Sequence, residues 1–410
     1  MAADTLFQRI TDYAHRADPY PLYAELRENG VARQDDGSYL VGTYHEIAAL
    51  LHDPRISSDR RHRAAPDETA GAEEQLPPSF IGLDDPEHHR LRGLAMRSFG
   101  PPHTPDRVDG MHEEITRIVQ DLIAGFQGKE RIDVVDDFAY PLPVTVICRL
   151  LGVPTEDEPR FRLWSDAIVA GFDPTPGEDP VERQRAGTEA RKAMALYLGE
   201  LAERRRGHPC DDMLSAFVND AGPGGQLTPL ETMATAVLLL IAGHETTVNL
   251  ITNGMLTLLR HPDALERLRS EPALMPRAVE ELLRFEPPVQ MLPQRTPLAD
   301  IEVAGITVPR GSPLILMLAS GNRDPRRFSD PDRFDPARED NQHLGFGSGV
   351  HSCFGAPLAR LETQIALHEL LRHLDTPRLV EDPPEYRRSP VLRGPRHLFI
   401  ERGGVGEGGK

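Results

Sequence analysis

Apolar residues recur at helical spacing along most of the chain. The pattern predicts helices over 86–99, 107–127, 137–151, 156–171 and 184–206. Ahead of them, the first 60 residues predict a helix in DPYPLYAELRENG, an alternating hairpin in GSYLVGTYHEI and a helix in YHEIAALLHDP. Polar stretches rich in proline and glycine, at 60–82 and in GFDPTPGEDP, predict two surface loops with the character of lids.

The segment 228–261 is the best-defined predicted helix. Thr228 can act as the N-cap, Pro229 takes the first helical position, and Glu231 completes a capping box. Some 30 residues at about 1.5 Å each would make a rod of roughly 45 Å. Its middle, VLLLIAGHETTVNLI, is apolar nearly all round, which predicts a path through the core. The polar run 243–247 interrupts it, and because burying polar groups without partners costs free energy, the run indicates a function.

The C-terminal half also contains alternating segments. Residues 295–318 predict short antiparallel strands joined by turns at Gly305 and 309–311, and 391–400 is expected to return to the same sheet. No segment reads as an interdomain linker. We therefore predict a mainly α fold with small antiparallel β-sheets, organised as one domain over 1–402 with a disordered tail over 403–410.

Composition and charge narrow the class of protein. The chain has 410 residues, of which 39% are hydrophobic and 27% charged, and its net charge of −18 argues against nucleic-acid binding. Three cysteines do not make a disulfide framework, which favours a reducing cytoplasm. The N-terminus lacks a signal-peptide pattern, and the longest apolar run, 236–242, is far shorter than the ~20 residues of a membrane span. We expect a cytoplasmic protein without a membrane segment.

The stretch HLGFGSGVHSCFGAPLARLE surrounds Cys353 with glycines and precedes a predicted helix. Glycines let a chain turn sharply and approach a flat ligand closely, and a helix N-terminus favours a thiolate. Zinc does not fit, because no second cysteine or His-x₃-His pair lies nearby. A single thiolate fits the axial ligand of a haem iron, whose porphyrin supplies four other donors. The alternative is a small structural cysteine without a ligand role, which we expect for Cys148, on an apolar helical stretch, and for Cys210, in a polar loop.

Three motifs resemble those of one family. Residues 346–355 match the haem-binding signature of the cytochrome P-450 superfamily, Phe-x-x-Gly-x-x-x-Cys-x-Gly, at every fixed position. The run 242–247 resembles the oxygen-activation motif of the family's central helix, and Glu281 with Arg284 resembles its Glu-x-x-Arg pair. Their order and spacing agree over essentially the whole chain. The resemblance implies the cytochrome P-450 fold, with haem b between the central helix and the cysteine loop.

The resemblance also implies roles for individual residues. Cys353 would bind the iron, Thr246 would donate a hydrogen bond during oxygen activation, and Glu245 would relay protons from solvent. The alternative for Thr246 is a helix kink in which its hydroxyl bonds back to a carbonyl. Other haem contacts implied are His88, Arg92, Ala242, Gly243, Arg295, Phe346, His351 and Gly355.

Four of these contacts, His88, Arg92, Arg295 and His351, would hold the haem propionates, since carboxylates need cations or donors; for each, the alternative is a solvated charge. The Glu-x-x-Arg pair would have a structural role, with Arg333 as its third member. The substrate pocket would be lined by segments 60–82 and 165–185, by the central helix around 238–242, and by Leu239, Val289, Met291, Leu292, Val391 and Leu392. For 289–292 the alternative is ordinary core packing.

The implied activity is a monooxygenase reaction. One atom of O₂ would enter a C–H bond or cross a C=C bond of a medium-to-large apolar molecule, such as a macrolide or other natural product, steroid, terpenoid or fatty acid. Two electrons would come from NAD(P)H through a ferredoxin and its reductase, with Arg97 and Arg360 as candidate docking cations on a monomer.

Three alternatives remain at this stage. One is a peroxide-driven fatty-acid hydroxylase or decarboxylase, one is a non-catalytic haem-binding protein, and one is a scaffold that has lost haem. The intact pair of Glu245 and Thr246 favours the reductase-fed enzyme, because oxygen cleavage needs two protons and an acid beside an alcohol can deliver them.

Overall fold

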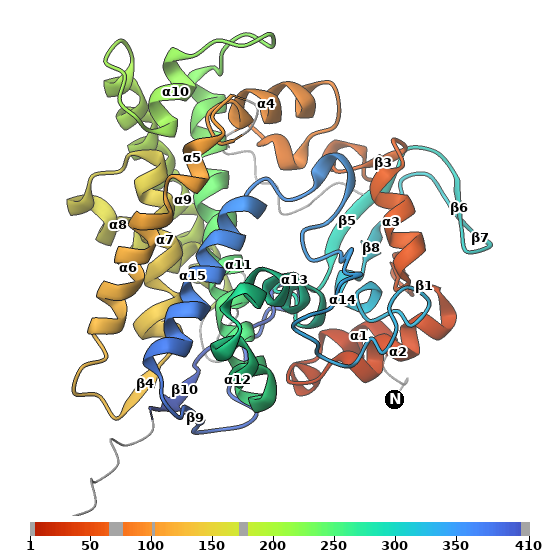
Figure 1. Ribbon diagram of the computed structural model, residues 1–410. Helices are drawn as coiled ribbons and strands as arrows, with labels where there is room; N and C mark the ends of the chain where they lie inside the picture. The colour runs from red at the N-terminus through yellow and green to blue at the C-terminus, as the bar shows by residue number, and fades with distance from the viewer. Residues whose placement is uncertain (1–4, 65–76, 101–102, 172–178, 403–410) are drawn as a thin grey trace, which may run out of the picture.

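A computed structural model describes residues 5–64, 77–100, 103–171 and 179–402 (Figure 1). The predicted tail 403–410 and the middle of both predicted lids lie outside the described residues. Helices gather on one side of the molecule, and the five-stranded sheet lies on the other with the N-terminal helices. The longer helices are α2 (Tyr20–Asn29), α3 (Tyr44–His52), α4 (Glu87–Met96), α6 (His112–Ala124), α7 (Pro141–Leu151), α8 (Glu158–Ala170), α9 (Pro180–Arg205), α11 (Pro229–Arg260), α12 (Pro262–Ser270), α13 (Met275–Phe285) and α15 (Ala356–His373).

Shorter helices and strands, besides several 3-10 turns, connect these helices. The short helices are α1 (Leu6–Thr11), α5 (Asp106–Asp109), α10 (Met213–Asn219), α14 (Leu318–Gly321) and a π-helical turn η4 (Val135–Ala139). The strands are β1 (Val31–Arg33), β2 (Tyr39–Val41), β3 (Ile56–Ser57), β4 (Arg131–Asp133), β5 (Leu292–Pro297), β6 (Ile301–Val303), β7 (Ile306–Val308), β8 (Leu314–Leu316), β9 (Arg378–Leu379) and β10 (Phe399–Glu401).

The predicted central helix is confirmed as α11. Thr228 accepts the backbone N–H of Glu231, the Glu231 side chain accepts the N–H of Thr228, and Pro229 occupies the first turn. The helix packs against α7, α9, α13 and α15. By length and composition alone it is the one described helix that could cross a membrane, but 72% of its most apolar window is buried inside the protein. It is a core helix.

Two sheets and a hairpin contain the strands. The larger sheet has the order β1-β2-β8-β5-β3, and the hairpin pairs β6 with β7. The expectation of antiparallel pairing holds for every strand pair but one, because β2 and β8 run parallel. These two strands are far apart in the sequence, so no hairpin constrains their direction. The strands predicted in 295–318 are thus present, β5 and β8 in a mixed sheet and β6 and β7 in a separate hairpin.

The predicted return of 391–400 to this sheet is wrong for its last part. Strand β10 instead pairs with β4 and β9 in a separate three-stranded sheet, order β4-β10-β9. Only the start of the segment approaches β5: the Gln290 N–H donates to the Val391 carbonyl at 2.8 Å, and Val289 and Leu392 form an isolated antiparallel bridge. The C-terminal strand is therefore attached to β4 and β9 near the helical side of the molecule (Figure 1).

Candidate active site

The loop before Cys353 is folded tightly by backbone hydrogen bonds. The Cys353 N–H donates to the Phe346 carbonyl at 2.8 Å, and the Gly347 N–H donates to the Leu344 carbonyl at 2.8 Å. Gly347 and Gly349 have φ of 66° and 69°, values that other residues adopt only with strain. A Cβ on Gly349 would also lie 2.1 Å from the Leu51 carbonyl oxygen. The glycine spacing therefore seats the loop against the end of α3.

The Cys353 sulfur lies just before the N-terminus of α15. Its side chain is exposed on one face. Even so, surrounding protein atoms are dense enough that burial raises the pKa of the thiol, while the N–H groups of Gly355 and Ala356 and the charges of Arg92 and Arg360 act to lower it. The site thus aims several positive dipoles and charges at one accessible sulfur, which is the surrounding that a metal-binding thiolate needs.

Four basic residues predicted to contact propionates lie together. The rings of His88 and His351 are 4.2 Å apart between centroids, and the Arg92 Nη2 donates to the Ser352 carbonyl at 2.8 Å. Burial, with the positive neighbours His88 and Arg295, lowers the pKa of His351 to about 4. Within the described ranges, neither Arg92 nor Arg295 forms an ion pair with a carboxylate. The cluster is suited to bind carboxylates.

His88 has a buried ring nitrogen without a hydrogen-bond partner. Its side chain is 3% exposed, its Nδ1 lies 3.3 Å from a carboxylate oxygen of Asp85, and its Nε2 has no hydrogen-bond partner. Buried polar atoms are rarely left in this state unless a ligand or water completes them. An acceptor supplied by a bound carboxylate would satisfy this nitrogen.

One face of α11 is accessible although the helix is otherwise buried. Leu238, Ala242 and Thr246 follow one another at intervals of four residues, so they share a face. Ala242 is exposed and the other two are partly exposed. Leu239, predicted to line the pocket, is 8% exposed and faces the core. Leu238, which begins the predicted lining segment 238–242, is the member of this pair on the accessible side.

The polar motif of α11 is locally satisfied. The hydroxyls of Thr246 and Thr247 donate to the carbonyls of Ala242 and Gly243 at 2.7 and 3.0 Å, and the helix stays α-helical throughout. Glu245 is 4% exposed and forms an ion pair with Arg387 at 2.8 Å. The Asn249 side chain also donates to Glu245, at 3.2 Å. The motif therefore places a buried acid beside an accessible hydroxyl.

His244 has a different surrounding. It is 1% exposed, its ring lies against Tyr140 at 4.4 Å between centroids, and its Nε2 donates to the Tyr140 carbonyl at 3.3 Å. Burial lowers the pKa of His244 to about 3, so the ring is neutral at physiological pH. It packs the helix against the start of α7.

These residues fit haem. A Cβ on Gly355 would meet no atom within 4 Å, and one on Gly243 would meet only the Ile147 Cδ1 at 4.0 Å. The backbone is therefore open to a ligand at both the cysteine loop and α11. An accessible sulfur, two arginines of the basic cluster without a carboxylate partner among the described residues, and this open backbone together suit a flat iron-containing cofactor with two carboxylates.

Comparison with known proteins agrees with this geometry. The family model described as "Cytochrome P450" matches residues 40–401. The chain belongs to the cytochrome P450 family. It is 41% identical to the cytochrome P450 monooxygenase PikC of Streptomyces venezuelae over 94% of this chain and 91% of that protein, and 39% identical to the vitamin D(3) 25-hydroxylase of Pseudonocardia autotrophica over 94% of each. It is a P450 monooxygenase, which implies haem as cofactor and O₂ as co-substrate.

Solved structures of P450s also resemble the fold. The structure of CYP109E1 from Bacillus megaterium in complex with corticosterone matches with a TM-score of 0.84 and 32% identity, over 95% of this chain and 99% of that one. The predicted cytochrome P-450 fold is confirmed.

The Glu-x-x-Arg pair of this P450 is completely buried, and one predicted partner is wrong. Glu281 and Arg284 are 0% exposed and lie 2.8 Å apart. The third member is Arg338, whose Nε lies 3.1 Å from both Glu281 carboxylate oxygens. Arg333 was expected there, but its side chain is 68% exposed, and only its carbonyl joins the network. Sequence spacing alone does not show which arginine of a loop turns inward.

The remaining predicted lining residues separate into two groups. Val289, Leu292 and Leu392 are partly exposed, and the bridge between Val289 and Leu392 brings them together. Met291 is 2% exposed and lies in a hydrophobic cluster with Tyr23 and Leu26, because successive residues of an extended chain point to opposite sides. Of the predicted lids, 65–76 and 172–178 lie outside the described residues.

The two candidate docking cations also differ from expectation. Arg97 is half-buried and lies against the position of Gly222, where a Cβ would approach its side chain to 2.9 Å. Arg360 is partly exposed but forms two hydrogen bonds with Glu280, at 2.6 and 2.9 Å, and lies 4.7 Å from the Phe346 ring centroid. Sequence reasoning missed Glu280, whose position next to Glu281 was the available clue.

Proposed function

We propose that this P450 hydroxylates or epoxidises a medium-to-large apolar molecule, using O₂ and two electrons that pass from NAD(P)H through a ferredoxin reductase and a ferredoxin. The observation that carries the proposal is the accessible face of α11, where an apolar side chain, a small residue and a threonine follow in line. A face of this kind can contact an apolar substrate and places the Thr246 hydroxyl beside it.

The proposed cofactor contacts come from both sides of the site. Cys353 supplies the thiolate ligand, Phe346 and Gly355 flank it, and Ala242 and Gly243 leave room on α11. The propionates are held by His88, Arg92, Arg295 and His351. When bound, haem supplies the activation of O₂, so that one oxygen atom enters the substrate and the other becomes water. Arg92 donates to the loop carbonyl of Ser352 and therefore also orients the loop.

Proton supply is assigned to Thr246 and Glu245. The Thr246 hydroxyl donates to the Ala242 carbonyl, and the residue lies on the accessible face of the helix. Glu245 is the adjacent acid, held by Arg387. An acid that exchanges protons with an alcohol gives the two-proton transfer that the reaction needs.

The substrate class rests on the apolar lining. Leu238 and the partly exposed Val289, Leu292 and Leu392 present hydrocarbon surface, with few polar anchors among them. Two similar proteins are named for, or bound to, such molecules: vitamin D(3) for the 25-hydroxylase and corticosterone for CYP109E1. We infer a substrate of comparable size and polarity, acted on in the cytoplasm by a monomer that docks its ferredoxin near Arg360.

The first experiment tests the iron ligand. The haem-loaded protein is reduced and exposed to carbon monoxide, and the absorption is recorded. Thiolate ligation by Cys353 gives the red-shifted band diagnostic of a sulfur anion opposite the gas. Correctly folded, haem-loaded protein without this band would overturn the assignment.

The second experiment tests the hydroxyl. With ferredoxin, reductase and NADPH, Thr246→Ala is expected to consume O₂ but to release peroxide, with roughly tenfold less product per NADPH. Thr247→Ala is the matched control, since Thr247 makes the same bond to a helix carbonyl but is buried, 2% exposed. Full coupling in Thr246→Ala would contradict the role. Equal turnover with hydrogen peroxide alone would favour the peroxide-driven alternative.

A further inference from the structure

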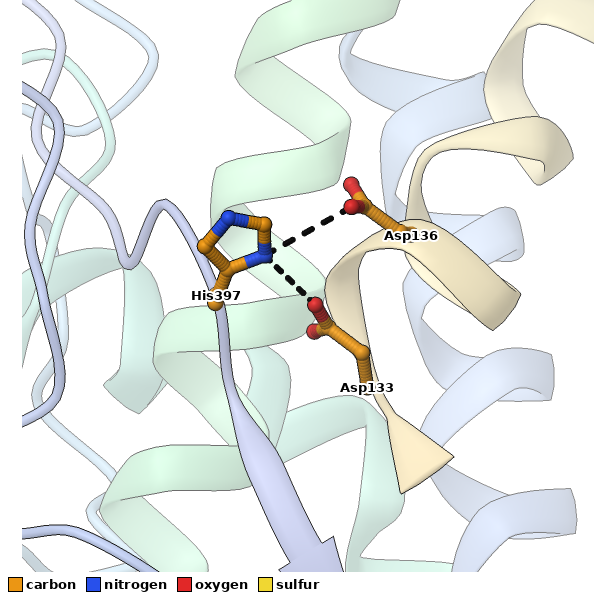
Figure 2. A group of neighbouring side chains, drawn as sticks. All are labelled: Asp133, Asp136 and His397. Atoms are coloured by element: carbon orange, nitrogen blue, oxygen red, sulfur yellow. Dashed lines mark hydrogen bonds and ion pairs between the residues drawn. The ribbon is translucent and has the colours of Figure 1, made fainter. Parts of the chain in front are cut away.

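Three metal-ligating side chains meet away from the haem contacts. Figure 2 shows Asp133 at the end of β4, Asp136 in η4 and His397 just before β10, with the imidazole aimed at both carboxylates. The ligand atoms all lie within 4.8 Å of one another. Nothing in the proposed P450 reaction uses these residues. Among the described residues this is the one group of three or more such ligands that is close enough to share an ion.

The distances are close to those of a tetrahedral metal site. The His397 Nδ1 lies 3.5 Å from an Asp136 carboxylate oxygen and 2.6 Å from one of Asp133. Zinc bonds of about 2.0–2.1 Å place neighbouring ligands of a tetrahedron roughly 3.3 Å apart. The contact to Asp136 already has nearly this spacing, the contact to Asp133 needs to open by about 0.7 Å, and the two carboxylate oxygens lie within 4.8 Å of each other. A small rotation of the imidazole or of the exposed Asp136 side chain is sufficient.

The surroundings fix the ligands from behind. Asp133 is 7% exposed, and its second oxygen accepts the N–H groups of Val135 and Leu398, each at 3.0 Å. The His397 ring stacks on Phe399 at 5.5 Å between centroids, with an angle of 13° between the planes. Outer contacts of this kind orient ligands in metal sites. The exposed Asp136 leaves an approach for an ion and for a completing water.

Two features oppose the binding of an ion, and the type of ligands limits which ion can bind. The guanidinium of Arg396 lies 3.3 Å from the other oxygen of Asp136, and His397 must give up any proton on Nδ1 to bind a metal. Calcium and magnesium prefer about six or more oxygen ligands, so one nitrogen and two carboxylates do not suit them. A borderline cation that accepts imidazole and carboxylate in fourfold coordination does.

We propose that Asp133, Asp136 and His397 form a structural site for a divalent transition-metal cation of the zinc class. The ion ties the last strand to η4, which packs against α11, and completes its coordination with water. Without the ion, the hydrogen bond between His397 and Asp133 makes the same connection more weakly. Binding of the ion therefore strengthens the attachment of β10 to η4, beside the central helix.

The test uses the full haem-loaded chain, stripped of loose metal with a chelator and titrated with zinc chloride by calorimetry. We expect one saturable site per chain, with affinity at least about tenfold lower in Asp136→Asn and His397→Gln. The control is His112→Gln, an exposed histidine outside the group, which should bind zinc as the wild type does. Calcium and magnesium should give no saturable heat.

A second readout separates binding from misfolding. At a hundredfold excess over the wild-type dissociation constant, zinc should raise the apparent melting temperature of the wild type by about 3 °C, and that of Asp136→Asn by no more than about half as much. Asp136 is exposed, so this variant folds even if the histidine variant does not. Zinc should also slow amide exchange over 131–139 and 397–401. Equal zinc affinity in wild type, Asp136→Asn and His397→Gln, or no saturable binding at all, would overturn the proposal.

Discussion

Two glutamates that are neighbours in the sequence, Glu280 and Glu281 on α13, serve different parts of the P450. Consecutive residues on a helix point about 100° apart, so one direction can be buried while the next reaches another segment. The Glu281 side chain is completely enclosed, whereas that of Glu280 is 29% exposed. Both carboxylates pair with arginine, but they connect different segments of the chain.

Glu281 organises the segment that precedes the cysteine loop. It binds Arg284 and Arg338, and it accepts the N–H of Asp335 at 3.0 Å and the Asn341 side chain at 3.2 Å. Arg284 in turn donates to carbonyls of Asn322, Pro331 and Arg333 at 3.0, 2.7 and 3.2 Å. One buried carboxylate therefore determines the course of residues 322–341.

Glu280 forms hydrogen bonds with residues before and after Cys353 and so connects the two ends of the cysteine loop. It accepts two hydrogen bonds from Arg360, which follows Cys353 on α15, and one from the Nε2 of His343, which precedes it, at 3.1 Å. The Nδ1 of His343 accepts the Gly345 N–H at 3.0 Å, which leaves the proton on Nε2 for Glu280. The burial of each glutamate determines how much free energy is lost when its ion pairs are removed. The partners of each glutamate determine which segment is affected: residues 322–341 for Glu281 and the cysteine loop for Glu280.

The largest effect should come from Glu281→Gln. The amide keeps the shape but removes the charge, which leaves Arg284 and Arg338 buried without a counter-ion. Breaking a buried pair in this way costs about 3–5 kcal/mol. We expect that loss in the apparent free energy of unfolding in urea, followed by haem absorbance and by circular dichroism, together with a low yield of haem-loaded protein. A loss below about 1 kcal/mol would mean that this pair is no more important than a surface one.

A smaller effect should separate the two arginines of the same loop. Arg338→Ala removes the bonds to Glu281 and the bond to the Ser329 carbonyl at 2.9 Å, and should cost about 1–3 kcal/mol. Arg333→Ala is the matched control, because that side chain is mostly exposed and its nearest carboxylate is 3.6 Å away; it should change the unfolding free energy by less than about 0.5 kcal/mol. Similar losses in both variants would restore Arg333 as a network member.

This difference also shows what the sequence could predict. The long central helix and its capping box were predictable, because local hydrogen-bonding signals and apolar periodicity act over a few residues. The pairing of Glu281 with Arg284 was predictable from helical spacing. The choice of Arg338 over Arg333 was not, because it depends on how a loop of 20 residues folds back (322–341), and both arginines offer the same chemistry at similar distance along the chain.

The same distinction between local signals and long-range contacts applies to the candidate active site. Cys353 could be singled out because its glycine pattern and the helix after it are local. The facing direction of neighbouring residues on α11, which exposes Leu238 and buries Leu239, follows from helix phase once Thr246 is placed on the accessible side. The parallel pairing of β2 with β8 and the attachment of β10 to β4 are long-range choices that no local pattern contains.

The smallest effect, and the one that sharpens the contrast most, is the pH dependence of Glu280. Burial alone would raise its pKa, but hydrogen bonds from Arg360 and His343 overcome this and lower it from the ordinary value of 4.5 to about 2. A carboxyl whose pKa is depressed in the folded state stabilises the fold above its unfolded pKa and loses that contribution as the pH falls through the folded pKa. The window for Glu280 is therefore pH 4.5 down to about 2.

Solvent screening of this partly exposed group reduces the gain to about 1–2 kcal/mol at pH 7. Glu280→Gln should lose that amount at neutral pH, and its deficit relative to wild type should shrink below pH 4.5. The control is Glu339→Gln, whose side chain is 84% exposed and pairs with Arg277 at 3.5 Å; it should follow the wild-type curve. Because Glu280 holds both sides of the cysteine loop, its variant should also show less thiolate-type absorption of the carbon monoxide complex at neutral pH, at unchanged helix content, and the difference from wild type should narrow below pH 4.5. If absorption and helix content fall together, as expected for Glu281→Gln, the two glutamates support one cooperative unit and the contrast between them fails.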